Sequence, residues 1–131
     1  MKRRSCLTAM LTVLAGTKAV FAQTAAKNPI VLYCDLSVDA AHEKQMLDNF
    51  HNIFKPAAEK FQGYRDVKIL KLRTVYSGSA PPHVNYRFQL TYESEEKRQL
   101  WIHSKVHQTV WPMVESTVTD KGYLTLLTDS R

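Results

Sequence analysis

The sequence has few of the residues that build cross-linked or phosphate-binding sites. It contains two cysteines and four glycines among 131 residues. It has no glycine-rich loop that could hold a phosphate and no serine at a nucleophile elbow. Its N-terminal apolar run is shorter than the roughly 20 residues that span a membrane. These absences argue against nucleotide-loop enzymes, serine hydrolases and a membrane-spanning segment.

The first 22 residues have the organisation of a secretory signal. A basic head over residues 2–4 precedes a mildly apolar run over 6–17, and Val20-Phe21-Ala22 stands before Gln23. This arrangement predicts cleavage after Ala22. The paired Arg3-Arg4 also suits the twin-arginine route. We therefore expect a periplasmic or secreted protein, exported by the Sec or twin-arginine pathway, whose mature chain is residues 23–131.

Cleavage would change the charge and the cysteine content. The whole chain carries a net charge of +6, but the signal holds four basic residues and no acidic one, which leaves 14 basic and 12 acidic side chains, or +2. The remaining charges are interspersed, which argues against nucleic-acid binding. Cys34 would be the sole cysteine of a mature chain of 109 residues. That length predicts one domain, with no internal disulfide and with Cys34 buried in a strand.

The apolar pattern predicts strand–helix–strand twice. Alternating segments over 30–38, 67–76, 84–92 and 123–128 indicate strands. Asp39 and Ser94 are placed to cap the helices that follow the first and third strands. Pro56 should kink or divide the first helix, and Gly63 suits its end. We expect an α+β fold of ferredoxin-like βαββαβ type, an antiparallel four-stranded sheet with two helices on one face.

One face of this sheet is polar in the predicted alternation. It carries Tyr33, Asp35, Lys71, Arg73, Asn85, Arg87 and Gln89, whereas Leu70 and Leu72 share the face that the helices cover. The polar face is either solvated or the lining of a chamber closed by a second copy of the chain. Because an uncovered sheet is a pairing hazard, a homodimer gains weight. In a chamber, Arg73 and Arg87 would favour an anionic or oxygen-rich ligand, and Tyr33 could stack on it.

The second helix is expected to run from Ser94 to about Trp111 or beyond. At 100° per residue, His103, His107 and Trp111 share one stripe. The two histidines have the i,i+4 spacing of a metal pair, but no third ligand is evident, and we expect no metal site. One of them could be a general base. A histidine with a purely structural role in the core is an equal alternative, whereas a tryptophan such as Trp111 is more often a core residue than part of a site.

A set of local features resembles a known family. It comprises Gly63-Tyr64 after the first helix, Tyr92-Glu93-Ser94 at the end of the third strand, and then Trp101, His103-Ser104, His107 and Trp111. With the order βαββαβ, these resemble the antibiotic-biosynthesis-monooxygenase-like domains of the dimeric α+β barrel superfamily. The resemblance implies a homodimer whose sheets form a barrel, and a cleft between helices and sheet. The superfamily includes cofactor-independent oxygenases of phenols and quinols and haem-degrading oxygenases. The asparagine that its oxygenases often have on the first strand is missing between Ile30 and Val38.

These observations together predict an exported homodimer that binds a small aromatic or quinol-like ligand and oxygenates it without a bound cofactor. His107 or His103 would take the phenolic proton, and Arg73 or Arg87 would stabilise the anion. Tyr33, Asp35 and Trp111 would shape the pocket. Two alternatives remain open. One is a non-catalytic binding or interaction module, and the other is a protein that binds haem through a helix histidine.

Overall fold

The computed structural model describes residues 28–131. The predicted signal sequence, residues 1–22, lies outside the described residues. The elements in chain order are β1 (Ile30–Leu36), α2 (Ala40–Asn49), η1 (Phe50–Phe54), α3 (Lys55–Glu59), β2 (Tyr64–Lys71), β3 (Tyr86–Tyr92), α4 (Glu95–Ile102), α5 (Lys105–Glu115) and β4 (Leu124–Asp129).

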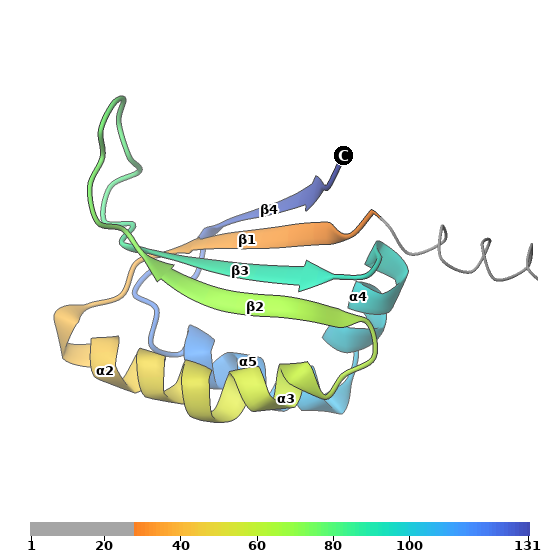
Figure 1. Cartoon of the computed structure of the whole chain (residues 1–131). Helices are drawn as coiled ribbons and strands as arrows, with labels where there is room; N and C mark the ends of the chain where they lie inside the picture. Colours follow the sequence, from red (N-terminus) through yellow and green to blue (C-terminus); the bar gives the residue numbers. More distant parts are fainter. Residues whose placement is uncertain (1–27) are drawn as a thin grey trace, which may run out of the picture.

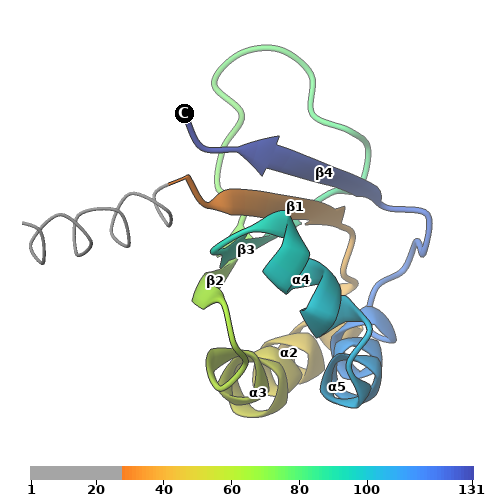
Figure 2. The same ribbon diagram turned by 90° about the vertical axis from the view of Figure 1, so that its right-hand side faces the viewer.

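The strands form one antiparallel sheet in the order β2-β3-β1-β4. The helices lie on a single side of this sheet, and the other side is uncovered (Figures 1 and 2). The expected ferredoxin-like α+β fold is therefore confirmed. Its repeated strand–helix–strand units produce this one-sided arrangement, because both crossover helices return on the same face.

The core lies between the helical layer and the sheet. Its largest fully buried side chains are Trp101, Tyr92, Phe50, Phe54, Phe88, Leu36 and Met46. Aromatic rings contact one another throughout the core. The Phe54 ring, for example, contacts four others, with ring centroids 5.4–6.0 Å apart: Phe50, Phe88, Trp101 and Trp111. Tilted and edge-on pairs of this kind stabilise a core beyond the area that they bury.

The first helical segment is continuous but irregular. A π-helical turn, η1, stands between α2 and α3, immediately before Pro56 at the start of α3. Proline has no N–H to donate to the preceding turn, so the predicted division of the helix occurs here. Asp39 precedes α2 in an extended conformation, but its side chain makes no capping hydrogen bond, so that predicted cap is wrong. Gly63 follows α3 with φ of 91°, the left-handed conformation that glycine adopts readily.

The second helical segment is broken, which corrects the prediction of one long helix. Ser94 caps α4 as expected, accepting a hydrogen bond from the Lys97 N–H. The chain then leaves α4 at His103, and Ser104 begins α5 as a second N-cap, in an extended conformation. A single 100° wheel therefore does not describe both helices. Trp101, which on such a wheel falls off the stripe of His103, His107 and Trp111, is only 1% exposed.

The predicted faces of β2 are inverted. In the observed register Val67 pairs with Leu90 and lies under the helices, and Leu70 pairs with Arg87 on the uncovered face. Lys71 lies on the helix side, where its Nζ is 2.6 Å from a carboxylate oxygen of Glu43 in α2. Both phases of this strand contain apolar residues, so alternation could not choose between them.

Candidate functional site

A cavity of about 170 Å³ lies between the helical layer and the sheet. Its walls come from β1, β3, β4, α4, α5, η1 and the turn before β4. The lining residues are Leu32, Cys34, Phe54, Phe88, Leu90, Arg98, Trp101, Ile102, His107, Trp111, Tyr123 and Thr125. Most of these side chains are apolar or aromatic, with a few polar groups among them. This is the usual composition of a small-molecule pocket.

His107 is the histidine that lines this cavity. Its backbone N–H donates to the Ser104 hydroxyl, which fixes it in the first turn of α5. Its ring is edge-on to Trp101, with centroids 5.1 Å apart, and stacks over Trp111 at 6.4 Å. Burial lowers the pKa of His107 below its usual 6.5, and the positive charge of Arg98 adds to this effect. The imidazole is therefore neutral near pH 7 and able to accept a proton.

His103 lies outside the cavity. It stands at the C-terminal end of α4, exposed to solvent, with Nδ1 2.8 Å from the backbone oxygen of Gln99. The break between α4 and α5 separates it from His107, so the two histidines are not an i,i+4 pair on one helix. Of the two histidines, His107 lines this cavity and His103 does not.

Tyr123 and Cys34 contribute polar groups to the wall on the β4 side. The Tyr123 hydroxyl donates to a carboxylate oxygen of Glu115 at 2.7 Å. Burial and this hydrogen bond raise the pKa of Tyr123 well above its usual 10. Burial also raises the pKa of the Cys34 thiol to about 11, and its sulfur lies 3.9 Å from the Thr125 hydroxyl. Both groups are neutral at physiological pH, and Cys34 is buried as predicted.

Arg98 supplies positive charge to the cavity wall, a role that the sequence analysis did not assign. Its guanidinium binds Glu95 through two hydrogen bonds of 2.7 and 3.0 Å, and its side chain is 11% exposed. This pairing lowers the pKa of Glu95. The i,i+3 spacing of the two residues on a helix predicts their ion pair. Nothing in the spacing, however, indicates that Arg98 also faces a cavity.

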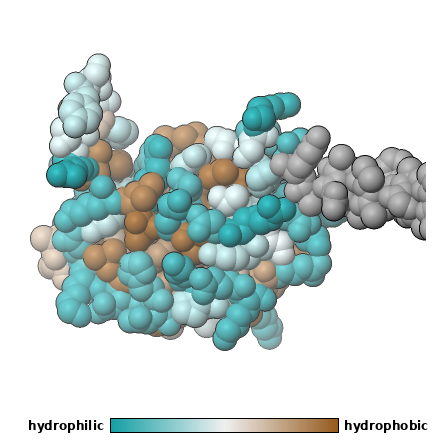
Figure 3. Space-filling model, viewed as in Figure 1, coloured by the Kyte–Doolittle hydropathy of each residue, from teal (hydrophilic) through white to brown (hydrophobic). Residues whose placement is uncertain are grey.

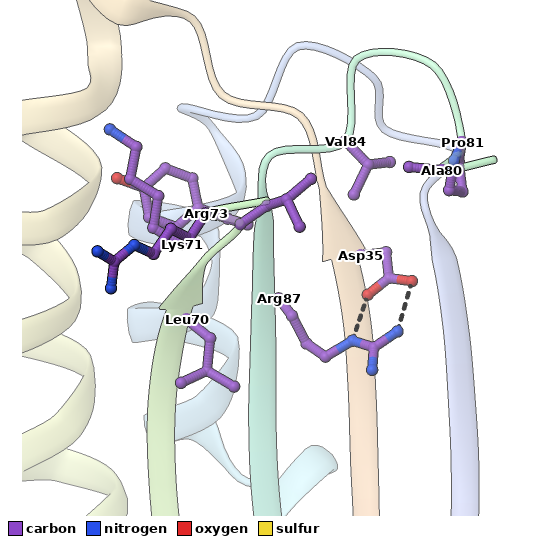
Figure 4. Close-up of a pocket in the computed structure, with 10 residues that line it drawn as sticks. Asp35, Leu70, Lys71, Arg73, Ala80, Pro81, Val84 and Arg87 are labelled. Carbon is purple, nitrogen blue, oxygen red and sulfur yellow. Dashed lines mark hydrogen bonds and ion pairs between the residues drawn. The ribbon is translucent and has the colours of Figure 1, made fainter. Parts of the chain in front are cut away.

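A second recess, of about 400 Å³, lies where β2 and β3 meet residues 72–85, and residues from both faces of the sheet line it. Asp35 and Arg87 face each other there from adjacent strands (Figure 4). Two hydrogen bonds of 2.7 and 3.1 Å join them. The Tyr33 ring lies against the same guanidinium, 4.9 Å from its central carbon. The hydrogen bond to Asp35 raises the pKa of Arg87 above its ordinary value.

The predicted site residues therefore fall into two groups. His107 and Trp111 line the cavity under the helices, whereas Asp35, Arg73 and Arg87 line the second recess. Arg87 cannot stabilise an anion formed at His107, because the sheet stands between them, and Arg73 does not line the cavity. Alternation along β1 and β3 explains the separation: neighbouring residues point to opposite faces. Each of the two arginines has a carboxylate partner, Asp35 for Arg87 and Glu95 for Arg98, so their position relative to the sheet is what distinguishes them.

The side chains and the volume of the cavity also bear on the binding of metal and haem. Within residues 28–131, no cluster of three histidine, cysteine or acidic side chains is placed to hold a metal ion. A cavity of about 150 Å³ holds one benzene molecule. The space of about 170 Å³ next to His107 therefore suits a single ring and does not fit a tetrapyrrole. No helix in the described part of the chain is long and apolar enough to cross a membrane.

Comparisons with known proteins establish the fold. No protein-family model matches the sequence, and a search of curated proteins gives no match. A dimeric ferredoxin-like protein of unknown function from Jannaschia sp. superimposes with a TM-score of 0.61 at 13% identity, over 80% of this chain and 99% of its own. A proposed antibiotic biosynthesis monooxygenase from Bordetella bronchiseptica gives a TM-score of 0.60 at 11% identity, over 80% and 97%. Another, from Caulobacter crescentus, gives 0.55 at 10% identity, over 79% and 89%. The chain thus has the ferredoxin-like fold of antibiotic-biosynthesis-monooxygenase-like proteins.

Proposed function

We propose that this protein is an exported homodimer that binds a one-ring phenol or hydroquinone and oxygenates it without a bound cofactor. The observation that carries the proposal is the half-buried His107, whose pKa is lowered, inside an aromatic cavity of about 170 Å³. A neutral histidine in an apolar pocket is suited to remove a phenolic proton. Export rests on the signal-like residues 1–22, and the mass of the protein recovered from the periplasm or medium tests it.

The proton step needs one base and one source of positive charge. His107 accepts the proton of the ring hydroxyl and becomes an imidazolium. Arg98 lines the same cavity and lies near enough to influence the pKa of His107. Although it is paired with Glu95, the Arg98 guanidinium adds to the charge of the imidazolium in favouring the phenolate. Arg98 therefore takes the role that the sequence analysis gave to Arg73 or Arg87.

Dioxygen is the oxidant in this proposal, and the substrate supplies all four electrons. The phenolate of a hydroquinone transfers electrons to dioxygen, and one oxygen atom is inserted at a ring carbon. The other oxygen atom leaves as water. The product of a hydroquinone is then a hydroxyquinone, so one substrate and one dioxygen give one product and one water. The protein contributes the base, the positive charge and a mostly apolar pocket.

The uncovered face of the sheet supports the homodimer. It exposes apolar side chains from both edge strands, namely Leu70 of β2 and Leu124 and Leu126 of β4. Apolar surface over the strands is visible in Figure 3. Exposed apolar side chains on an uncovered sheet face are typical of an association face. The Jannaschia protein of the same fold is described as dimeric.

Oxygen consumption with hydroquinone tests the proposal. We expect the wild type to consume one dioxygen per hydroquinone and His107→Gln to lose at least ~100-fold in rate, as expected when a general base is removed. His103→Gln is the matched control, because His103 is exposed outside the cavity. Equal uptake by the wild type and both variants would remove histidine from the mechanism. A ligand-induced rise in melting temperature without oxygen uptake would instead make the protein a binding module.

A further inference from the structure

The connection between β2 and β3 is far longer than its topology requires. The two strands are antiparallel neighbours, and Lys71 lies opposite Tyr86 at their ends. Two residues are enough to join such a pair. This chain uses residues 72–85, which contain neither helix nor strand. Loops of this length in compact domains are uncommon and usually have a function.

This segment projects on the side of the sheet that the helices leave uncovered (Figures 1 and 2). Its root is fixed. The side-chain amide of Asn85 exchanges two hydrogen bonds of 2.9 and 2.8 Å with the backbone of Val38, and the Leu72 N–H donates to the Asn85 carbonyl. The tip has no such anchorage: a Cβ added at Gly78 would meet no atom within 4 Å. A firmly held base thus carries a projecting tip.

Apolar side chains on the segment face water. Tyr76 is 97% exposed, and Val75 and Leu72 are also exposed. A tyrosine ring gains much from burial, and it loses little side-chain entropy when it is fixed, which makes it a common anchor in interfaces. Within one copy of the chain the Tyr76 ring lies in solvent and gains no free energy from burial.

We propose that residues 72–85 form a dimerisation arm that packs on the second copy of the chain, with Tyr76 as its anchor. This proposal rests on the homodimer of the proposed function. The occupant is a second copy because the arm rises on the uncovered side of the sheet (Figure 2), the side on which the strand register places Leu70, Leu124 and Leu126. A two-fold pair is self-complementary: each copy offers one arm and one uncovered sheet. The recess of about 400 Å³ lies at the root of the arm and adds to this surface.

The dissociation constant of the dimer tests the arm. Sedimentation velocity over a dilution series should show that Tyr76→Ser raises it at least ~10-fold, as expected for an aromatic anchor. Leu100→Ser is the matched control, because Leu100 is 54% exposed but belongs to α4, in the helical layer. It should leave the dissociation constant unchanged. Circular dichroism of each variant checks the fold.

A second measurement does not depend on a substitution. Amide hydrogen exchange of residues 72–85 should slow as the concentration rises through the dissociation constant, because the partner covers the arm. An unchanged dissociation constant in Tyr76→Ser, together with exchange that does not depend on concentration, would overturn the arm and leave the dimer standing. A wild type that stays monomeric throughout the series would overturn both the arm and the homodimer.

Discussion

His107 shows how burial sets the chemistry of a single residue. The imidazole is half-buried between two indole rings, which makes its charged form unfavourable. The folded state therefore binds a proton less readily than the unfolded state, whose histidine has a pKa near 6.5. Stability from this site is present above that value and is lost as the pH falls from 6.5 towards the folded pKa.

The lowered pKa of His107 predicts how the free energy of unfolding depends on pH. Between about pH 8 and about pH 5, the wild type should lose more unfolding free energy than His107→Gln, which does not titrate. Glu43 and Glu95 have pKa values below 4.5, so they contribute little in this window. Urea denaturation at several pH values measures the difference. His103→Gln serves as the control and should follow the wild type; identical pH dependence in all three proteins would contradict a lowered His107 pKa.

Trp111 limits the size of the ligand that fits in the cavity. Its ring lies between Phe88, Tyr123 and His107, with centroids 5.0–6.4 Å away, and forms much of the cavity wall. We expect phenol, but not 1-naphthol, to raise the melting temperature of the wild type. Trp111→Phe should improve naphthol binding relative to phenol by ~10-fold. Tyr33→Phe, on the other face of the sheet, should change neither; if naphthol binds the wild type as tightly as phenol, Trp111 does not limit the ligand.

At the scale of elements, the break between α4 and α5 decides which histidine enters the cavity. Ser104 stabilises the break through hydrogen bonds to residues on both sides of it. Its hydroxyl donates to the Trp101 carbonyl at 2.6 Å and accepts from the His107 N–H at 3.1 Å. The break turns Trp101 into the core and leaves His103 in solvent. One serine thus sets the direction of α5 and the position of the proposed base.

Removing this serine should affect stability and the site together. Ser104→Ala loses an N-cap, and we expect the free energy of unfolding to fall by about 1 kcal/mol. Because His107 lies in the first turn of α5, oxygen uptake should fall as well. Ser94→Ala removes the equivalent cap of α4 and is the control: it should lower stability by a similar amount while changing the activity less. Equal losses of activity in the two variants would mean that the cap acts through stability alone.

For the whole molecule, the helices cover one face of the sheet and leave the other face free to associate with a second copy. The uncovered face combines exposed leucines with the Asp35–Arg87 ion pair. A bidentate pair that becomes buried between two copies adds little net stability, but it disfavours misaligned pairings. The apolar side chains would then provide most of the attraction between the two sheets.

A charge on this face should prevent association. Leu126→Glu would place an unpaired carboxylate in the interface, so we expect a monomer at micromolar concentrations. Light scattering after size-exclusion chromatography measures the mass. Met113→Glu places the same charge on an exposed position of α5 and should remain dimeric. If Leu126→Glu keeps the mass of a dimer, the copies associate through another surface.

The sequence by itself determined the order of the elements, the capping by Ser94, the division near Pro56 and the burial of Cys34. These depend on local preference and on an unambiguous alternation of apolar residues. Only the tertiary structure decided the faces of β2, where both phases are partly apolar, and the break at Ser104, where the helical pattern continues through it. The tertiary structure also placed Arg98 and His107 in the lining of one cavity, with Arg87 on the other face of the sheet. Such placements depend on how distant segments pack against one another, and spacing along the chain does not encode that directly.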